Sequence, residues 1–348
     1  MLNKFKGCMI GGLIGDCLGA PFEFKYHENI VPMKKIIKFL EDVENMEEDK
    51  APDDYLQYTD DTAMARQIAV TFIEKKSLEP GELARNFTKE YFRQNWRGYG
   101  GSVVDVFDKL RKIDFADPFK PASEQFGGSG SFGNGAGMRG HPVALAGCGQ
   151  SERDLVTTAQ SVARLTHSHH LGVMGGVLQS LAVYHALHSS GPANILQKIR
   201  SVCTELEKDV QAEILFKHKL ELVEQFLEKR EDVDLQEVAR ELGNDVSAVN
   251  SVPTALYCAL SVLQNSRLDQ TKKLEETLKV AITMGGDTDT IASMACAITG
   301  AHLGLETIPR YLYTSCEDHQ QVLELAEQMY NVVFPTTDEP SSKRVKLD

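Results

Sequence analysis

Two short stretches of the chain each place carboxylates and threonine hydroxyls just before an alanine-rich apolar run. They are Thr59-Asp60-Asp61-Thr62 and Gly286-Asp287-Thr288-Asp289-Thr290, and they lie far apart in the 348-residue sequence. Carboxylate and hydroxyl oxygens are hard ligands, which suit Mg²⁺, Ca²⁺ or Mn²⁺ better than zinc or copper. If the two stretches meet in space, their paired aspartates could hold two divalent ions about 3.5–4 Å apart, as in other two-metal hydrolytic sites.

Each stretch also has a simpler interpretation as the start of a helix. Aspartate and threonine are favoured N-cap residues, and negative charge near a helix N-terminus is stabilising. A cap needs only one carboxylate, however, and both stretches carry a pair of them. The repetition of the pattern therefore favours a metal site over two ordinary caps.

The elements that must position these stretches are helices, because apolar residues recur at helical spacing and no alternating strand pattern occurs. We predict an all-α fold, a compact orthogonal helical bundle with the two-metal site between helix ends. A single domain is expected over residues 1–334. The helices are expected at 5–19, 62–76, 81–92, 101–112, 151–166, 172–188, 193–207, 210–229, 235–242, 271–283, 290–303 and 318–333, and from an N-cap region at Ser251 to Pro253 up to about 264.

The first predicted helix has a ridge of glycines at four-residue spacing, formed by Gly7, Gly11, Gly15 and Gly19. Each glycine costs a helix about 0.5–1 kcal/mol relative to alanine, so we expect another helix to pack there backbone to backbone. Asp16 lies near the helix end. Glu23 follows the helix-breaking Pro21 in an apolar setting, where desolvation can raise the pKa of a carboxyl group.

Two segments lack helical periodicity. Residues 25–57, which are rich in acids from Glu41 to Asp54, are interpreted as a partly solvated flap or loop. Residues 335–348 are interpreted as a polar, flexible tail. The tail contains Lys343-Arg344-Val345-Lys346, a short basic cluster that is either a nuclear localisation signal or an ordinary solvated terminus.

Residues 127–137 form a glycine-rich loop whose backbone N–H groups could make an anion-binding nest. Gly128-x-Gly130-x-x-Gly133 matches the dinucleotide-binding fingerprint in spacing, but no strand precedes it, and no P-loop lysine or nucleophile elbow is present. A flexible linker is the alternative. Phe126 and Phe132 flank the glycines, however, and such rings could stack on a base.

Three histidines, His167, His169 and His170, follow the helix predicted at 151–166, whose start at Ser151 and Asp154 is similar to a capping box. Three histidines suggest a transition-metal site, but a helix C-terminus also favours protonated histidine. We prefer the second explanation for His169 and His170.

The composition narrows the class of protein. With 42% hydrophobic and 25% charged residues the chain can build a globular core, and a net charge of −13 argues against a non-specific nucleic-acid binder. An anionic substrate would need local positive potential. The seven cysteines show no C-x-x-C spacing, which favours free thiols in a reducing compartment. No apolar run reaches the ~20 residues of a membrane span, and no signal or transit peptide is visible.

The motifs together resemble the ADP-ribosylglycohydrolase family over about residues 5–333. The resemblance rests on Gly15-Asp16 with Glu23, on the two acidic stretches and on His167. Further motifs are similar to a vertebrate branch that acts on serine-linked ADP-ribose and poly(ADP-ribose), namely Arg97-Gly98-Tyr99-Gly100, Gln125-Phe126, Met138-Arg139, Glu241-Leu242-Gly243-Asn244 and Ser251-Val252-Pro253-Thr254-Ala255. That branch has tyrosine where this chain has Phe132, so ring stacking is kept but a hydroxyl hydrogen bond is lost.

The resemblance implies an all-α fold with two Mg²⁺ ions and assigns roles by position. The implied metal ligands are Thr59, Asp60, Asp61, Asp287, Asp289 and Thr290. The implied catalytic residues are Glu23 and Asp287, either of which would activate water or handle the leaving-group proton. The implied substrate contacts are Asp60, Phe126, Ser129, Gly130, Ser131, Phe132, Gly133, Asn134, Gly135, His167 and Val246.

The function that the resemblance implies is Mg²⁺-dependent hydrolysis of O-linked ADP-ribose, on serine, in poly(ADP-ribose) and in O-acetyl-ADP-ribose. Three alternatives stay open: hydrolysis of arginine-linked ADP-ribose, a catalytically idle ADP-ribose-binding protein, and a two-metal phosphohydrolase that would release AMP. The expected partners are ADP-ribosylated proteins and poly(ADP-ribose), with ADP-ribose as product. We expect a monomer without DNA or membrane binding, located in the nucleus and cytoplasm, with the mitochondrial matrix as an alternative, and acting in the DNA damage response.

Overall fold

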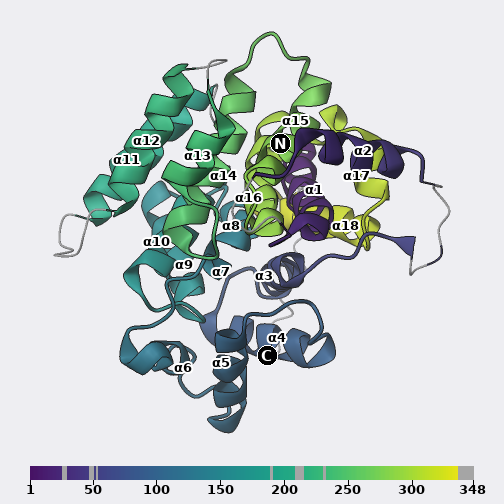
Figure 1. Cartoon of the computed structure of the whole chain (residues 1–348). Coiled ribbons are helices and arrows are strands. Elements are labelled where there is room, and N and C mark those ends of the chain that lie inside the picture. Colours follow the sequence, from purple (N-terminus) through teal and green to yellow (C-terminus); the bar gives the residue numbers. More distant parts are fainter. Residues whose placement is uncertain are drawn as a thin grey trace.

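The structure is a computed structural model that describes residues 1–25, 30–46, 51, 54–188, 191–207, 215–229 and 233–335. These residues form helices and no strand, which confirms the predicted all-α class (Figure 1). Two isolated β-bridges, Leu56 with Cys316 and Gly133 with Ser247, join loops within this part of the chain. In Figure 1, α16 lies between α11–α13 on one flank, α4–α6 below, and α2, α17 and α18 on the other flank.

Most of the described residues lie in helical elements. In chain order they are α1 (Leu2–Gly19), η1 (Ala20–Phe22), α2 (Met33–Glu44), α3 (Asp60–Lys75), α4 (Pro80–Arg93), α5 (Gly101–Lys112), α6 (Lys120–Ser123), η3 (Gln125–Gly128), α7 (Gly135–Met138), α8 (Gly140–Ala146), α9 (Glu152–Arg164), α10 (His170–His188), α11 (Pro192–Leu206), α12 (Leu215–Lys229), α13 (Leu235–Leu242), α14 (Ala248–Gln264), α15 (Gln270–Thr283), α16 (Thr288–Leu303), η5 (Leu305–Thr307), α17 (Arg310–Thr314) and α18 (His319–Val333).

The interpretation of residues 25–57 as a flap or loop is wrong for its middle part, which forms α2. Ile36, Leu40 and Val43 lie on one face of this helix and are buried. Their spacing is helical, but the neighbouring acids and lysines obscured it. The remaining parts of that segment at 26–29, 47–50 and 52–53 lie outside the described residues, as does the predicted tail from 336 onward with its basic cluster.

The expected start of the helix near Ser251 and Pro253 is also wrong, because α14 begins at Ala248 and Pro253 lies inside it. The cause is a polar network before the helix. The Asp245 carboxylate accepts hydrogen bonds from the Ser247 backbone N–H (2.8 Å) and hydroxyl (2.5 Å), and from the Asn250 amide. This network begins the helix early, and Pro253 is tolerated in its second turn.

The glycine ridge packs where the sequence predicted, backbone to backbone, and its partner is α16. A methyl group on Gly7 would lie 2.4 Å from the carbonyl oxygen of Gly300, and one on Gly11 would lie 2.2 Å from that of Cys296. Further along, the Gly15 position abuts Ala292 and the Gly19 position abuts Asp289. Residues with higher numbers on α1 contact residues with lower numbers on α16, so the two helices are antiparallel. The end of α1 therefore lies beside the start of α16.

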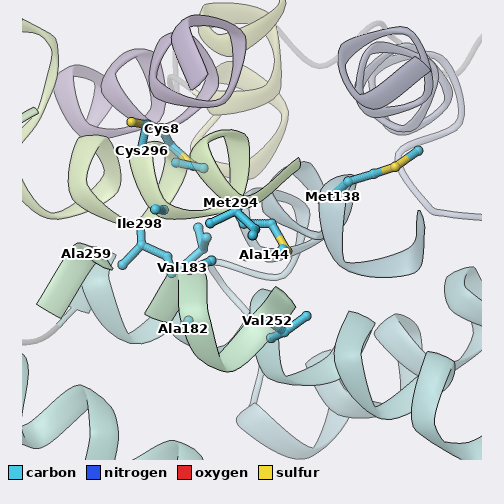
Figure 2. Packing of buried hydrophobic residues seen from close by; sticks show 14 of the residues in the cluster. Cys8, Met138, Ala144, Ala182, Val183, Val252, Ala259, Met294, Cys296 and Ile298 are labelled. Atoms are coloured by element: carbon cyan, nitrogen blue, oxygen red, sulfur yellow. The ribbon is translucent and has the colours of Figure 1, made fainter. Parts of the chain in front are cut away.

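The far side of α16 faces the hydrophobic core. Figure 2 shows Met294 and Ile298 of α16 in the same cluster as Val183 of α10 and Ala259 of α14. All of these side chains are buried. Fully burying side chains of this size stabilises a fold by about 1.5–3 kcal/mol each, so α16 is fixed firmly in the bundle.

Replacing Gly11 with alanine is expected to lower the free energy of unfolding by about 3 kcal/mol, because the new methyl group meets the Cys296 backbone and cannot be relieved by a rotamer change. Urea denaturation followed by circular dichroism would measure the loss. The matched control is Gly81→Ala in the first turn of α4, where nothing lies within 4 Å of the added carbon. Equal stabilities of the two variants would contradict the close packing of α1 on α16.

Candidate metal centre and active site

The first acidic stretch lies at the start of α3, where Thr59 is the N-cap and its hydroxyl accepts a hydrogen bond from the Asp61 N–H (3.3 Å). The fully buried carboxylate of Asp16 on α1 accepts hydrogen bonds from the backbone N–H groups of Thr59 (3.0 Å) and Thr62 (3.0 Å). These bonds satisfy N–H groups that a helix start leaves unpaired. Asp16 thereby joins the end of α1 to the first turn of α3.

The second acidic stretch lies at the start of α16, with Asp287 at the N-cap and Asp289 in the first turn. The Asp287 N–H donates to the carbonyl oxygen of Asn244 (2.8 Å). The Thr290 hydroxyl donates to Oδ1 of Asp61 (3.3 Å), so the two stretches are in direct contact. Each stretch thus starts a helix, as the simpler interpretation expected, and the two stretches also converge, as a shared metal site would require.

The convergence brings several carboxylates together without a basic side chain paired to them in the described residues. Glu23, Asp287 and Asp289 each offer an oxygen within 4.8 Å of the others. Oδ2 of Asp61 is buried and accepts no hydrogen bond. In the described part of the chain, none of these residues, nor Asp60, forms an ion pair with lysine, arginine or histidine. Buried charges without partners are costly, so this oxygen-only set fits one or more divalent metal ions.

The electrostatics of the acidic cluster reflect this crowding. Burial, with the neighbouring Asp16 carboxylate, raises the pKa of Asp60 to about 8. Burial and the nearby Asp287 and Asp16 raise the pKa of Glu23 to about 6. Burial and adjacent carboxylates also raise the pKa values of Asp61 and Asp289 well above the usual range. A bound cation would remove the repulsion that causes these shifts.

A cavity of about 340 Å³ opens beside the acidic cluster. This is within the usual size range of small-molecule sites. Its walls include most of the residues that the sequence had singled out: Glu23, Thr59, Asp60, Asp61, Phe126, Ser131, Phe132, Gly133, Asn134, Gly135, His167, Val246, Asp287, Asp289 and Thr290. Ser129 and Gly130 are not part of the wall. The Ser129 hydroxyl donates to the Phe126 carbonyl (3.0 Å), and Gly130 packs against Ser168 and His169.

The glycine-rich loop is held in place by the segment before α14. The Asn134 N–H donates to the Val246 carbonyl (2.9 Å), and the Ala248 N–H donates to the Phe132 carbonyl (3.0 Å). The Asn134 side chain donates to Oδ2 of Asp287 (2.6 Å), which connects the loop to the acidic cluster. The N–H groups of Gly133 and Asn134 are therefore already used within the chain, and the expected nest is smaller than the glycine content suggested.

Apolar groups stand exposed at the cavity. Phe126 is 60% exposed, Phe132 is 51% exposed and Val246 is 53% exposed. Large exposed apolar side chains that line one cavity indicate a binding surface more strongly than single exposed residues do. The cavity thus combines a group of carboxylates in its wall with exposed apolar side chains.

The histidines do not gather into a metal site within the described residues. The explanation by a helix C-terminus is also wrong, because α9 ends at Arg164 and His170 is the first residue of α10. Burial lowers the pKa of both His169 and His170, so neither is held in its protonated form. Their rings lie 4.4 Å apart outside the cavity wall, whereas His167 lines it.

Comparison with known proteins decides the family. The ADP-ribosylglycohydrolase family profile matches residues 1–339. This chain belongs to the ADP-ribosylglycohydrolase family. It is 39% identical to ADP-ribosylhydrolase ARH3 of Danio rerio, over 95% of this chain and 91% of the relative, and 36% identical to that of Homo sapiens, over 95% and 94%. The family and these relatives identify the chain as a hydrolase of ADP-ribosyl bonds.

More distant similarities extend over most of the chain. An uncharacterized protein of Archaeoglobus fulgidus is 25% identical over 340 residues. A solved structure, an ADP-ribosylglycohydrolase-related protein complex, superposes with a TM-score of 0.68 at 20% sequence identity and covers 95% of this chain and 98% of its own. Across the described residues, none of the helices combines the length and the apolar character that a membrane crossing requires.

Of the residues at or near the cavity that were not predicted as functional, three make contacts that shape the site. Arg139 and Thr166 line the cavity, and Asn244 holds the Asp287 backbone. Arg139 and Asn244 entered the sequence argument only as parts of family motifs. A buried arginine and a backbone acceptor have no distinguishing pattern in a single sequence, so no signal beyond those motifs could have identified them.

Proposed function

We propose that this chain is a Mg²⁺-dependent hydrolase of O-linked ADP-ribose, which releases ADP-ribose from serine on proteins and cleaves poly(ADP-ribose) and O-acetyl-ADP-ribose. The observation that carries the proposal is the contact between two oxygen-rich helix starts, through Thr290 and Asp61, in the wall of a cavity that the glycine-rich loop also lines. The identities to proteins named ADP-ribosylhydrolase ARH3 support the hydrolytic class.

Two Mg²⁺ ions would be held by oxygen ligands from both helix starts, namely Thr59, Asp60, Asp61, Asp287, Asp289 and Thr290. The unpartnered Oδ2 of Asp61 and the absence of nitrogen or sulfur ligands in the cluster support this choice of metal. When bound, the ions supply positive charge that orients the distal ribose and offsets the charge of the carboxylates.

The chain's own carboxylates would perform the proton transfers. Water attacks the anomeric carbon of the ribose as the bond from that carbon to the serine oxygen breaks, and the serine oxygen takes up a proton. Glu23 or Asp287 would accept the proton of the attacking water. The surrounding carboxylates would stabilise the oxocarbenium-like transition state.

The remaining predicted residues would bind the nucleotide part. Ser131, Gly133, Asn134 and Gly135 would contact the diphosphate, with Ser129 and Gly130 supporting the loop from behind. Phe126 and Phe132 would hold the adenine, and His167 would donate a hydrogen bond to the diphosphate or ribose. Asp60 and Val246 would complete the set of substrate contacts.

A serine-ADP-ribosylated peptide tests this proposal directly. Incubation with Mg²⁺ should yield unmodified peptide and free ADP-ribose by mass spectrometry, and EDTA should abolish both. Turnover of an arginine-linked peptide instead would replace the substrate assignment. Release of AMP would identify a phosphohydrolase, and tight ADP-ribose binding without any turnover would identify an idle binding protein.

Phe132→Ala is expected to weaken ADP-ribose binding about 10- to 100-fold, because stacking of a base on an aromatic ring contributes about 1–3 kcal/mol. Isothermal titration calorimetry with ADP-ribose would measure the change. Phe132→Tyr should keep the affinity. The matched control is Phe92→Ala, since Phe92 is 43% exposed but lies outside the cavity wall. Equal effects of the two alanine variants would exclude stacking on Phe132.

The proposed setting follows the family resemblance. We infer a monomer that acts in the nucleus and cytoplasm on ADP-ribosylated proteins, including those formed in the DNA damage response, without binding DNA itself. The net charge of −13 supports the last point, because DNA would be repelled. Light scattering after gel filtration would test the monomer.

A further inference from the structure

Arg139 is an arginine side chain enclosed entirely by the protein, at the inner wall of the cavity. It is 0% exposed and forms no ion pair among the described residues. Its Nη1 donates to the Gly135 carbonyl (2.7 Å), its Nη2 donates to the Thr166 hydroxyl (2.6 Å), and the guanidinium lies 5.0 Å from the Phe87 ring centre. A buried guanidinium without a carboxylate partner suggests a functional role, because no ion pair offsets the free-energy cost of removing its charge from water.

Thr166 links this arginine to His167. Its Oγ1 lies 2.7 Å from Nδ1 of His167. Arginine can only donate, so the Thr166 oxygen is the acceptor from Arg139 and its own hydrogen is free to point elsewhere. Across the described residues, the Thr166 hydroxyl has no other hydrogen-bond partner than these two. A hydroxyl oxygen can accept two hydrogen bonds, but between these two partners only Nδ1 of His167 can accept the hydroxyl hydrogen. The arrangement that satisfies this hydrogen leaves Nδ1 without a proton.

The proton of the neutral imidazole then resides on Nε2, which is directed at the glycine-rich loop. A methyl group added to Gly135 would lie 3.1 Å from this Nε2, and one added to Gly133 would lie 3.4 Å from it. The two glycines thus leave open space in front of the N–H. Burial and the adjacent Arg139 charge lower the pKa of His167 to about 3, so the ring is neutral at physiological pH.

We propose that Arg139 and Thr166 are positioning residues that hold neutral His167 as its Nε2–H tautomer, so that it presents one fixed hydrogen-bond donor to the anionic diphosphate of the substrate. This inference rests on the proposed function for the identity of the anion. The Arg139 charge behind the donor also supplies the local positive potential that an acidic protein needs to bind an anion.

The tautomer can be observed in the full-length protein without any substrate. Long-range ¹⁵N–¹H correlation spectra distinguish protonated from unprotonated imidazole nitrogens, and His167→Gln identifies the signals of His167 by their loss. The expected result is an unprotonated Nδ1 and a protonated Nε2. A protonated Nδ1 in the unmodified chain would overturn the proposal, and this readout does not depend on any variant of Thr166.

Two variants of Thr166 test the connection to binding. Thr166→Val removes the hydroxyl at similar volume and should mix the tautomers and weaken ADP-ribose binding about tenfold. Thr166→Ser restores the hydroxyl and should restore both readouts. In a His167→Gln background, Thr166→Val should have little further effect on affinity, because the imidazole that the hydroxyl orients is gone. Full additivity of the two changes would mean that Thr166 acts through general packing.

These outcomes separate the inference from the proposed function. If serine-linked substrates are not hydrolysed, but Thr166→Val still changes the tautomer and the ADP-ribose affinity, the substrate assignment fails and the positioning role stands. If turnover is observed but Thr166→Val changes neither the tautomer nor the ADP-ribose affinity, the positioning role fails and the proposed function stands.

Discussion

Asp61→Asn is expected to lower kcat/KM about a thousandfold and, in EDTA, to raise the melting temperature by about 2 °C. The activity falls because Asp61 joins the two acidic stretches through Thr290, and losing a metal ligand removes several kcal/mol of transition-state stabilisation. Stability rises because one of several mutually repelling buried carboxylates becomes neutral. Asparagine keeps an acceptor for the Thr290 hydroxyl and gains a donor that the neighbouring carboxylates can accept.

Thermal unfolding with and without Mg²⁺ checks both parts of this prediction. At a Mg²⁺ concentration a hundred times Kd, binding should add about 2.7 kcal/mol to the free energy of unfolding of the unmodified chain and so raise its melting temperature. The melting temperature of Asp61→Asn should rise much less. Asp105→Asn on the exposed face of α5 is the control and should respond to Mg²⁺ as the unmodified chain does. If Asp61→Asn kept the full Mg²⁺ response, Asp61 would not be a ligand.

Glu23→Gln is expected to lower kcat about 10²- to 10⁴-fold with little change in KM, the range that removal of a general base gives. Glu23 follows η1, and the Phe24 N–H donates to the Gly286 carbonyl (2.9 Å), which fixes this segment beside the second acidic stretch. Glutamine keeps the shape of the side chain but cannot accept a proton. Steady-state kinetics on a serine-linked peptide would give kcat and KM separately.

Asp287→Asn tests whether Asp287 binds metal, whereas the kcat of Glu23→Gln decides between the two candidate bases. A metal ligand should lose both the Mg²⁺-dependent rise in melting temperature and the activity, whereas a base that is not a ligand should lose only the activity. If Glu23→Gln retains normal kcat, the proton is taken elsewhere and Asp287 becomes the preferred base. If Glu23→Gln also loses the Mg²⁺ response, Glu23 acts as a ligand.

The glycine ridge and the two acidic stretches could be predicted because each is a short pattern of residue types that repeats in the sequence. Four glycines at helical spacing have one economical explanation, a close helix neighbour, and α16 provides it. Paired carboxylates beside hydroxyls likewise recur in both stretches. The helix at 33–44 was missed for the opposite reason, since its three buried residues are outnumbered by exposed charged ones.

The parts of the site that could not be predicted depend on backbone groups and on burial. Asn244 holds the Asp287 backbone through its carbonyl oxygen, a group that every residue has, while its side-chain amide donates to the Met284 carbonyl (2.7 Å). Outside the family motif, its position before α14 does not reveal this contact. Arg139 is 0% exposed, yet arginines are mostly exposed, so the sequence alone favours a surface position. The tautomer of His167 depends on a threonine hydroxyl whose orientation only the three-dimensional arrangement reveals.

The seam between α1 and α16 has a consequence for how the protein is made. α1 is synthesised long before α16, whose backbone fills its glycine face, and most of the described helices lie between the two in the sequence. Such pairing of distant segments raises the contact order and delays completion of the fold. During translation the glycine ridge therefore lacks its partner until α16 has been made, and a chain that stops before α16 would have half of the acidic cluster and an uncovered glycine face. We expect newly made chains to depend on chaperones until α16 is complete.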